Sequence, residues 1–224
     1  MSRSSVRTVA MILTVLAGAV ACRARSGANA AVPGPAADEA RATAPAKETA
    51  VVAGGCFWGI QAVFQHVKGV VSATSGYSGG TMKNPDYEAV SSGETGHAES
   101  VQIVYDPSQV TYGELLRVFF SVALDPTEVN RQGPDEGTQY RSLILYGNDE
   151  QKHIAEAYIA QLNSAKVFRK AIATQVVPLK AFYQAEGYHQ NYATLHPDNP
   201  YIVYNDAPKV ANLRREFPEL YTGK

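Results

Sequence analysis

The residues best suited to chemistry lie in one short stretch, Gly54-Gly55-Cys56-Phe57-Trp58-Gly59. An apolar run ends at the two glycines, so Cys56 is expected in the first turn of a following helix. The unpaired N–H groups and the helix dipole at such a turn favour a thiolate and lower the pKa of the thiol. Two aromatic side chains directly after the cysteine could form an apolar wall beside it. The stretch predicts a reactive thiol, and a buried structural cysteine among core aromatics is the alternative that it leaves open.

Five further segments combine glycine, aromatic and polar residues: Gly76-Tyr77-Ser78-Gly79-Gly80, Asn84-Pro85-Asp86-Tyr87, Thr95-Gly96-His97-Ala98-Glu99, Gly137-Thr138-Gln139-Tyr140-Arg141-Ser142 and His189-Gln190-Asn191-Tyr192. Together with residues 55–59, and in this order, they resemble the signatures of the peptide methionine sulfoxide reductase A family. The resemblance extends from about Val51 to Tyr204. It implies an α/β plait fold and the thiol-dependent reduction of methionine S-sulfoxide, free or in proteins, to methionine. The preference for the S epimer follows from the resemblance alone.

The family's chemistry explains why a thiol and a carboxyl group are needed together. A thiolate must attack the sulfur of the sulfoxide, and an acid must protonate the departing oxygen. The resemblance implies that Cys56 is the nucleophile and Glu99 the general acid. Glu99 must then be protonated at rest, through a pKa raised by burial among aromatics. Strand alternation alone would make Glu99 an exposed carboxylate at a strand edge.

The resemblance also assigns residues to substrate binding. Tyr87 and Tyr140 are implied to donate hydroxyl hydrogen bonds to the sulfoxide oxygen, where negative charge develops. Phe57 and Trp58 are implied to form a cage for the methyl group, with plain core packing as the alternative.

Other positions match the family by motif and carry less specific roles. Asp135, in a polar loop, is implied to orient the site and its water. Tyr192 and Tyr204 match tyrosines that line the family's pocket. His97 and His189 also match, but a single histidine is more often a structural hydrogen-bonding group.

The reaction leaves Cys56 as a sulfenic acid. Many family members then use a second cysteine in the C-terminal tail, but here no cysteine follows Cys56, and the tail reads Asn-Pro-Tyr-Ile-Val-Tyr at 199–204. We therefore expect an external thiol reductant, a thioredoxin-like protein or dithiothreitol in vitro, with a Cys22–Cys56 disulfide as the alternative outcome. No bound cofactor is expected, and no metal, because the five histidines lack ligand spacing.

The elements that must position these residues follow from periodicity and turn signals. Strands are expected at 50–54, 70–77, 100–105 and 142–146, and helices over 60–67 and 111–124, the second opened by a Thr111–Glu114 capping box. This order of strands and helices is the split βαβ pattern and predicts an α+β fold, the ferredoxin-like α/β plait. A polar loop is expected at 125–139, a third helix from the Asn148 cap to about Lys166, and one more strand at 174–177. The segment 180–224 is expected to be long, mostly irregular and wrapped around the domain.

The N-terminal residues differ in composition from the rest. Arg3 and Arg7 precede a short apolar run at 9–21 that ends in Ala-Val-Ala, which predicts a signal peptide over 1–21 and export to the periplasm or cell envelope. An uncleaved anchor and lipidation of Cys22 are the alternatives left open. Residues 22–48, rich in Ala, Pro and Gly, are expected to be a flexible tether, and 49–224 the reductase domain. An exported domain with one unpaired thiol has no disulfide framework, which favours a function for that thiol.

Composition and charge exclude other classes. The chain has 20 basic and 21 acidic residues, a formal net charge of −1. It therefore lacks the surplus of basic residues that a nucleic-acid-binding surface requires. We expect a monomer whose partners are oxidised proteins or peptides and a thiol reductase. A thiol peroxidase, a cysteine hydrolase using His97 or His189, and a non-enzymatic peptide-binding module are the rivals, and incubation with a methionine sulfoxide peptide and dithiothreitol distinguishes them.

Overall fold

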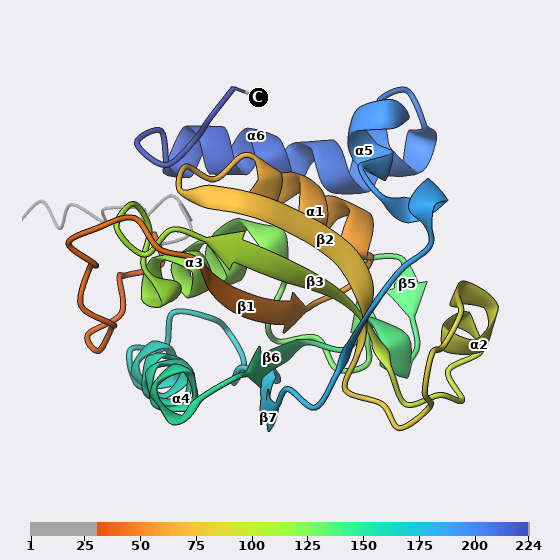
Figure 1. Cartoon of the computed structure of the whole chain (residues 1–224), viewed down its shortest axis with the longest axis horizontal. Helices are drawn as coiled ribbons and strands as arrows, with labels where there is room; N and C mark the ends of the chain where they lie inside the picture. The colour runs from red at the N-terminus through yellow and green to blue at the C-terminus, as the bar shows by residue number, and fades with distance from the viewer. Residues whose placement is uncertain (1–30, 224) are drawn as a thin grey trace, which may run out of the picture.

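The apolar run at the start of the domain forms the centre of a six-stranded sheet. In the computed structural model, which describes residues 31–223, the strand order is β7-β6-β1-β3-β2-β8 (Figure 1). The strands are β1 (Glu48–Ala53), β2 (Val70–Ser78), β3 (Ala98–Tyr105), β4 (Arg131–Gln132), β5 (Asp135–Glu136), β6 (Leu143–Tyr146), β7 (Gln175–Pro178) and β8 (Phe182–Gln184). β4 and β5 form a separate two-stranded hairpin.

The inner strands β6-β1-β3-β2 are antiparallel to one another. They are the four strands expected from the sequence, in the order of a split βαβ plait, so the predicted fold class is confirmed. β7 extends the sheet in parallel to β6, and β8 pairs antiparallel with β2. The longer helices are α1 (Phe57–Gln65), α3 (Tyr112–Val118), α4 (Asp149–Ser164) and α6 (Ala207–Glu216), and α2 (Tyr87–Ser91) and α5 (Tyr192–Leu195) are single turns. Short 3-10 or π turns are η1 (Phe119–Ala123), η2 (Thr138–Tyr140), η3 (Gly187–His189) and η4 (Ile202–Asp206).

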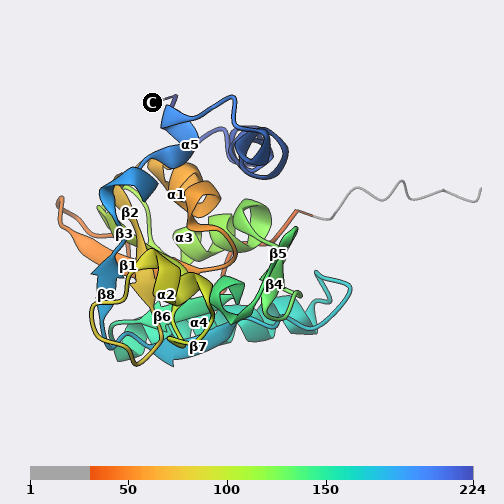
Figure 2. The ribbon, with the colours of Figure 1, turned by 90° about the vertical axis from the view of Figure 1, so that its right-hand side faces the viewer.

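The two faces of the sheet are covered differently, and β1 contributes to both. Ala50 and Val52 belong to the main core, where α1 and α3 cover the sheet, and Figure 2 shows these helices on one side of it. Val51 and Ala53 belong to a smaller cluster beneath residues 177–182. Because alternate residues of a strand face opposite ways, burial on both faces gives the continuous apolar run that marks β1 in the sequence.

Local capping signals position the helices as predicted. Thr111 Oγ1 accepts the Glu114 N–H at 3.3 Å, and Glu114 accepts the Thr111 N–H at 2.9 Å, which completes the capping box of α3. Asn148 accepts the Gln151 N–H at 2.8 Å and caps α4.

The segment before β1 is docked on the domain, which contradicts the predicted flexible tether for residues 31–47; residues 1–30 lie outside the described residues. The Arg117 Nε–H donates to the carbonyl of buried Val32 at 2.9 Å. Asp38 accepts the Gly113 N–H at 2.8 Å and the Thr111 hydroxyl at 2.5 Å, and Glu39 accepts the Tyr112 N–H at 2.8 Å. This N-terminal arm (residues 31–47) therefore supplies carboxylates to the first turn of α3, where unpaired N–H groups attract them.

The C-terminal segment wraps the domain as expected but contains more regular structure than predicted. β8 closes one edge of the sheet, and α6 lies along α1 (Figure 1). Leu213 and Phe217 are buried. The helix is consistent with a proline near its start, Pro208, and with the apolar spacing of Val210, Leu213 and Phe217, although an irregular segment was predicted here.

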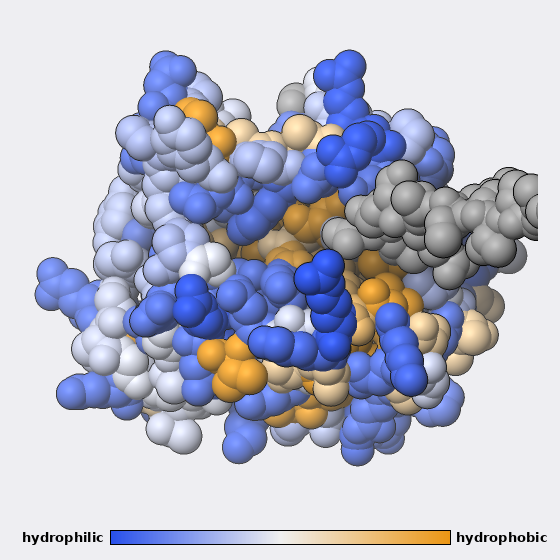
Figure 3. Space-filling view, turned by 180° about the vertical axis from the view of Figure 1, so that it is seen from behind, coloured by the Kyte–Doolittle hydropathy of each residue, from blue (hydrophilic) through white to orange (hydrophobic). Residues whose placement is uncertain are grey.

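A large hollow lies away from the residues singled out for chemistry. It encloses about 880 Å³ between η1, the loop 165–170 and the end of α6. Figure 3 shows apolar side chains gathered in a hollow on this face. Among the described residues that line the hollow there is no cysteine or histidine.

Candidate active site

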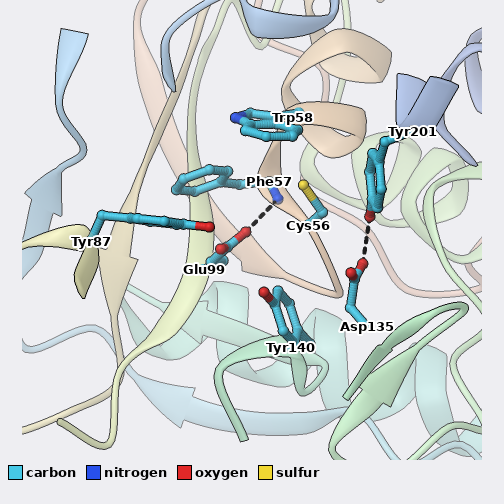
Figure 4. Close-up of a pocket in the computed structure, with 8 residues that line it drawn as sticks. All are labelled: Cys56, Phe57, Trp58, Tyr87, Glu99, Asp135, Tyr140 and Tyr201. Carbon is cyan, nitrogen blue, oxygen red and sulfur yellow. Dashed lines mark hydrogen bonds between the residues drawn. The ribbon is translucent and has the colours of Figure 1, made fainter. Parts of the chain in front are cut away.

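A pocket of about 210 Å³ opens at the carboxyl end of β1 (Figure 4). Its lining brings together eight residues from five parts of the chain: Cys56, Phe57, Trp58, Tyr87, Glu99, Asp135, Tyr140 and Tyr201. Seven of them were singled out from the sequence, and Tyr201 was not.

Sheet register explains why Cys56 and Glu99 meet. β1 runs antiparallel to β3, and Ala53 at the end of β1 pairs with Ser100 near the start of β3. Glu99 therefore lies beside the loop that carries Cys56. Gly55 in that loop has φ +94°, and a Cβ there would come within 2.7 Å of the side chain of Gln132. The turn that presents the cysteine consequently requires glycine at position 55.

Cys56 is the N-cap of α1, and its side chain is only 8% exposed. Burial raises the pKa of its thiol well above the ordinary value, and the charges of Glu99 and Asp206 raise it further. The Trp58 N–H and the Lys209 ammonium act in the opposite direction. The prediction of a lowered pKa is therefore wrong, because loss of water around the sulfur outweighs the favourable helix terminus. The free pocket holds a thiol at neutral pH.

Glu99 is 3% exposed, which confirms its predicted burial. Its Oε2 accepts the Phe57 N–H at 3.0 Å, so the first turn of α1 holds the carboxyl group (Figure 4). Burial raises the pKa of Glu99 to about 8, although the Phe57 N–H acts to lower it. Glu99 is therefore mostly protonated at neutral pH and is able to release a proton inside the pocket.

Three tyrosines place hydroxyl groups at the pocket. Tyr87 opens α2 and Tyr140 closes η2, and Figure 4 shows both hydroxyls directed toward the region of Glu99. The Tyr201 hydroxyl donates to Asp135 Oδ2. Burial raises the pKa of all three tyrosines, so each keeps its proton and remains a hydrogen-bond donor.

Phe57 and Trp58 form one wall of the pocket, as predicted (Figure 4). Tyr192 does not line the pocket. It stacks on Trp58 from behind, with ring centroids 3.8 Å apart at 11°. Tyr204, also predicted at the pocket, is 79% exposed. Tyr201 takes this place in the pocket lining, and the helical turn η4 begins at the next residue, Ile202. The Asn-Pro-Tyr sequence gave no signal to choose among the tyrosines of the tail.

A buried ion pair behind Cys56 was also missed. Asp206 is fully buried, and Lys209 Nζ lies 3.2 Å from its Oδ1. The Asp206 carboxylate lies against α1 at Gly59, where a Cβ would come within 2.1 Å of Oδ1. Asp206 Oδ2 has no hydrogen-bond partner among residues 31–223. Because Asp206 comes from the C-terminal segment, sequence alone gave no reason to place it beside Cys56.

The two matched histidines hold structure rather than line the pocket. His97 is buried, its Nδ1 accepts the Gly80 N–H at 3.1 Å, and its Nε2 lies 2.8 Å from the Met82 carbonyl. His189 is 2% exposed and accepts the Trp58 Nε1–H at 3.2 Å. Neither histidine lines the pocket with Cys56. Within the part of the chain that the structure describes, the thiol therefore lacks the histidine base of a cysteine hydrolase.

Comparison with known proteins decides the family. The family model for peptide methionine sulfoxide reductase matches residues 48–220. The chain belongs to the peptide methionine sulfoxide reductase family. The peptide methionine sulfoxide reductase MsrA 2 of Mesorhizobium japonicum is 61% identical to it over 81% of this chain and 93% of that one. A second reductase of this name, from Synechocystis, is 52% identical over 79% of this chain and 83% of that one.

Two solved structures share the fold. Methionine sulfoxide reductase A of Corynebacterium diphtheriae is 38% identical, with a TM-score of 0.60 over 70% of this chain and 78% of that one. Reduced Mxr1 of Saccharomyces cerevisiae is 33% identical, with a TM-score of 0.61 over 68% of this chain and 87% of that one.

Between residues 31 and 223, no group of three or more His, Cys, Asp or Glu side chains is arranged to hold a metal ion. In the same range, none of the helices has the length and apolar character that crossing a bilayer requires.

Proposed function

We propose that this enzyme reduces methionine S-sulfoxide, free or in oxidised proteins, to methionine, with Cys56 as nucleophile and Glu99 as general acid. One observation carries the proposal: a protonated carboxyl group lies against the same helical turn that presents a buried thiol, inside an aromatic pocket. An oxygen that leaves sulfur requires a proton, and the neutral carboxyl group of Glu99 is placed to supply it.

The chemical step balances with these two groups. Cys56 loses its proton to solvent and its sulfur attacks the sulfoxide, while Glu99 donates a proton to the sulfoxide oxygen. Attack joins the Cys56 sulfur to the substrate sulfur, and the protonated oxygen then leaves the substrate sulfur as hydroxide. Hydroxide adds to the Cys56 sulfur as the bond between the two sulfurs breaks. An S–O bond to Cys56 has then replaced the S–O bond of the substrate, and two electrons have passed from the Cys56 sulfur to the substrate sulfur. The products are methionine and a Cys56 sulfenic acid, and Glu99 regains its proton from solvent.

The remaining pocket residues supply binding and charge stabilisation. The hydroxyls of Tyr87 and Tyr140 donate to the oxygen as it gains negative charge. Phe57 and Trp58 contact the methyl group and exclude water. The Tyr201–Asp135 pair closes the opposite side of the pocket (Figure 4).

A stereospecific assay tests the proposal. Each separated epimer of a methionine sulfoxide peptide is incubated with the enzyme and dithiothreitol, and methionine is measured by mass spectrometry. The S epimer should be reduced and the R epimer should not. Cys56→Ser should abolish the reaction, while Tyr204→Phe, which changes an exposed side chain, should leave it intact. Peroxide consumption or ester cleavage without methionine formation would contradict the assignment.

The fate of the sulfenic acid is part of the same proposal. No cysteine follows Cys56 in the chain, so an external thiol, such as a thioredoxin-like protein, reduces it directly. Mass spectrometry after one turnover without reductant should show Cys56 with one added oxygen. A Cys22–Cys56 disulfide as the main product, absent in Cys22→Ser, would overturn this route.

Export completes the proposal. The composition of residues 1–21 supports a signal peptide that directs the enzyme to the periplasm or cell envelope. Mass spectrometry of the enzyme recovered from the envelope of a producing bacterium should show a chain beginning at Cys22. An added lipid on Cys22 would make the enzyme membrane-anchored, and an intact Met1 in the cytoplasmic fraction would refute export.

A further inference from the structure

His189 lies directly behind the aromatic wall of the pocket. Its ring centroid is 5.1 Å from that of Phe57, 4.4 Å from that of Tyr87 and 5.9 Å from that of Trp58. The side chain is 2% exposed. One imidazole therefore contacts three of the pocket's aromatic residues, which come from α1 and α2.

One contact is directional and fixes the state of the imidazole. The Trp58 Nε1–H donates to His189 Nδ1 at 3.2 Å. An indole nitrogen is only a donor, so Nδ1 must be the acceptor, and the neutral ring carries its proton on Nε2. Among the described residues, buried Nε2 has no hydrogen-bond partner, and it lies 4.0 Å from Glu186 Oε2.

Glu186 is held in place by two other groups. Its Oε2 accepts the Tyr77 hydroxyl at 2.8 Å, and its Oε1 accepts the Tyr87 N–H at 2.9 Å. These bonds connect the segment that carries His189 to β2 and to the first turn of α2. The imidazole consequently occupies a fixed position relative to Tyr87, independently of Trp58.

We propose that His189 is the positioning residue of the methyl-binding wall, and that its neutral ring holds Trp58 and braces Phe57 and Tyr87 from behind. This rests on the function proposed above. The indole of Trp58 lies between His189, which accepts its N–H, and Tyr192, which stacks on its face. Without the acceptor, the orientation of the indole would depend on stacking alone.

Protonation of His189 should release this support. A second ring proton on Nδ1 would face the Trp58 N–H, and the hydrogen bond would be lost. The titratable groups around the ring are Glu186 and Tyr188 on its own segment and Tyr87 on α2. His196 packs at a tilt against Tyr192, on the other side of Trp58. Burial lowers the pKa of His189, against the opposing influence of Glu186. The wall should therefore be intact at neutral pH and loosen on the acid side of pH 6.5.

Tryptophan fluorescence tests the proposal without an activity assay, because Trp58 is the only tryptophan in the chain. A protonated imidazole beside an indole quenches its emission. Titration of the wild type from pH 8 to pH 5 should show an emission transition with a midpoint below 6.5, separate from any change near pH 8 that accompanies ionisation of Glu99. His189→Asn, which retains an acceptor but cannot titrate, should remove the transition, and His196→Gln should retain it. A wild-type emission that does not change with pH, or a transition lost only in His196→Gln, would overturn the proposal.

Kinetics supply the second readout. His189→Phe keeps an aromatic ring but removes the acceptor, and loss of one neutral hydrogen bond should raise KM about 2- to 10-fold. The methyl group is bound equally in the ground and transition states, so kcat should change little. In His189→Asn the retained acceptor should bring KM closer to the wild-type value than in His189→Phe. An unchanged KM in a folded His189→Phe variant would overturn the positioning role, whereas failure of the wild type to reduce sulfoxide would refute only the proposed function, because the fluorescence transition is independent of turnover.

Discussion

Glu99→Gln tests the central chemical assignment. At a pKa of about 8, roughly nine in ten Glu99 side chains are protonated at pH 7. Glutamine has nearly the same shape and is still able to accept the Phe57 N–H, but it has no proton to release. General acid catalysis contributes about 10²- to 10⁴-fold. The variant should therefore retain its fold and lose about that factor in the rate of methionine formation.

The measurement is a single turnover at pH 7 without reductant, quenched at intervals, with methionine counted per Cys56. Glu94→Gln is the matched control, because Glu94 is an exposed carboxylate five residues earlier. It should retain the wild-type rate. A Glu99→Gln rate within about threefold of the wild type would refute the role of Glu99 as proton donor.

Alkylation of Cys56 separates proton donation from an effect on the thiol. At pH 9 Glu99 is mostly charged in the wild type and raises the pKa of Cys56. Glutamine removes that charge, so iodoacetamide should react with Cys56 faster in the variant at pH 9 even though turnover is slower. If turnover and alkylation fell together, the carboxyl group would act by shaping the site and not by donating a proton.

Further predictions concern the charges, hydroxyls and caps around this group. Folding raises the pKa of Glu99 from 4.5 to about 8. Between these pH values the folded state holds a proton that the unfolded chain has released. The free energy of unfolding should therefore fall by about 5 kcal/mol as the pH rises from 4.5 to 8. The free energy of unfolding of Glu99→Gln, measured in urea, should depend less on pH than that of the wild type. An equal pH dependence in the two proteins would contradict the raised pKa of Glu99. Asp206→Asn should speed alkylation of Cys56 at fixed pH, because one charge that raises the thiol pKa is removed; a slower reaction would contradict this. Tyr140→Phe should slow single-turnover reduction by about 10- to 100-fold, the worth of a hydrogen bond to a charged group. A loss larger than that of Glu99→Gln would contradict the assignment of Glu99, and not Tyr140, as the main proton donor. Thr111→Ala should cost about 1–2 kcal/mol of stability in urea, with no change in kcat; an unchanged midpoint would show that the capping box is dispensable.

Sequence reasoning predicted the elements whose signals are local. The four inner strands, the capping box at Thr111 and the Asn148 cap each depend on residues within a few positions of one another, and all are present. The plait followed from the order of these elements. The motif segments likewise placed seven of the eight pocket residues correctly.

Contacts between distant segments could not be predicted in the same way. Asp206 meets Cys56 only because η4 and α6 return to α1, and the same return places Tyr201, and not Tyr204, at the pocket. The pKa of Cys56 was wrong for a related reason. The helix terminus that favours a thiolate is visible in the sequence, whereas the burial and the two neighbouring carboxyl groups that oppose it are tertiary properties.

The N-terminal arm has a practical consequence for handling the protein. Its carboxylates satisfy N–H groups at the start of α3, and its backbone accepts hydrogen bonds from Arg117 and Tyr158. A shortened chain that starts at Thr49 would leave those donors without partners and uncover the apolar core surface that Val32 covers. Purification tags are therefore better fused ahead of residue 31, and limited proteolysis should spare the arm while the enzyme is native.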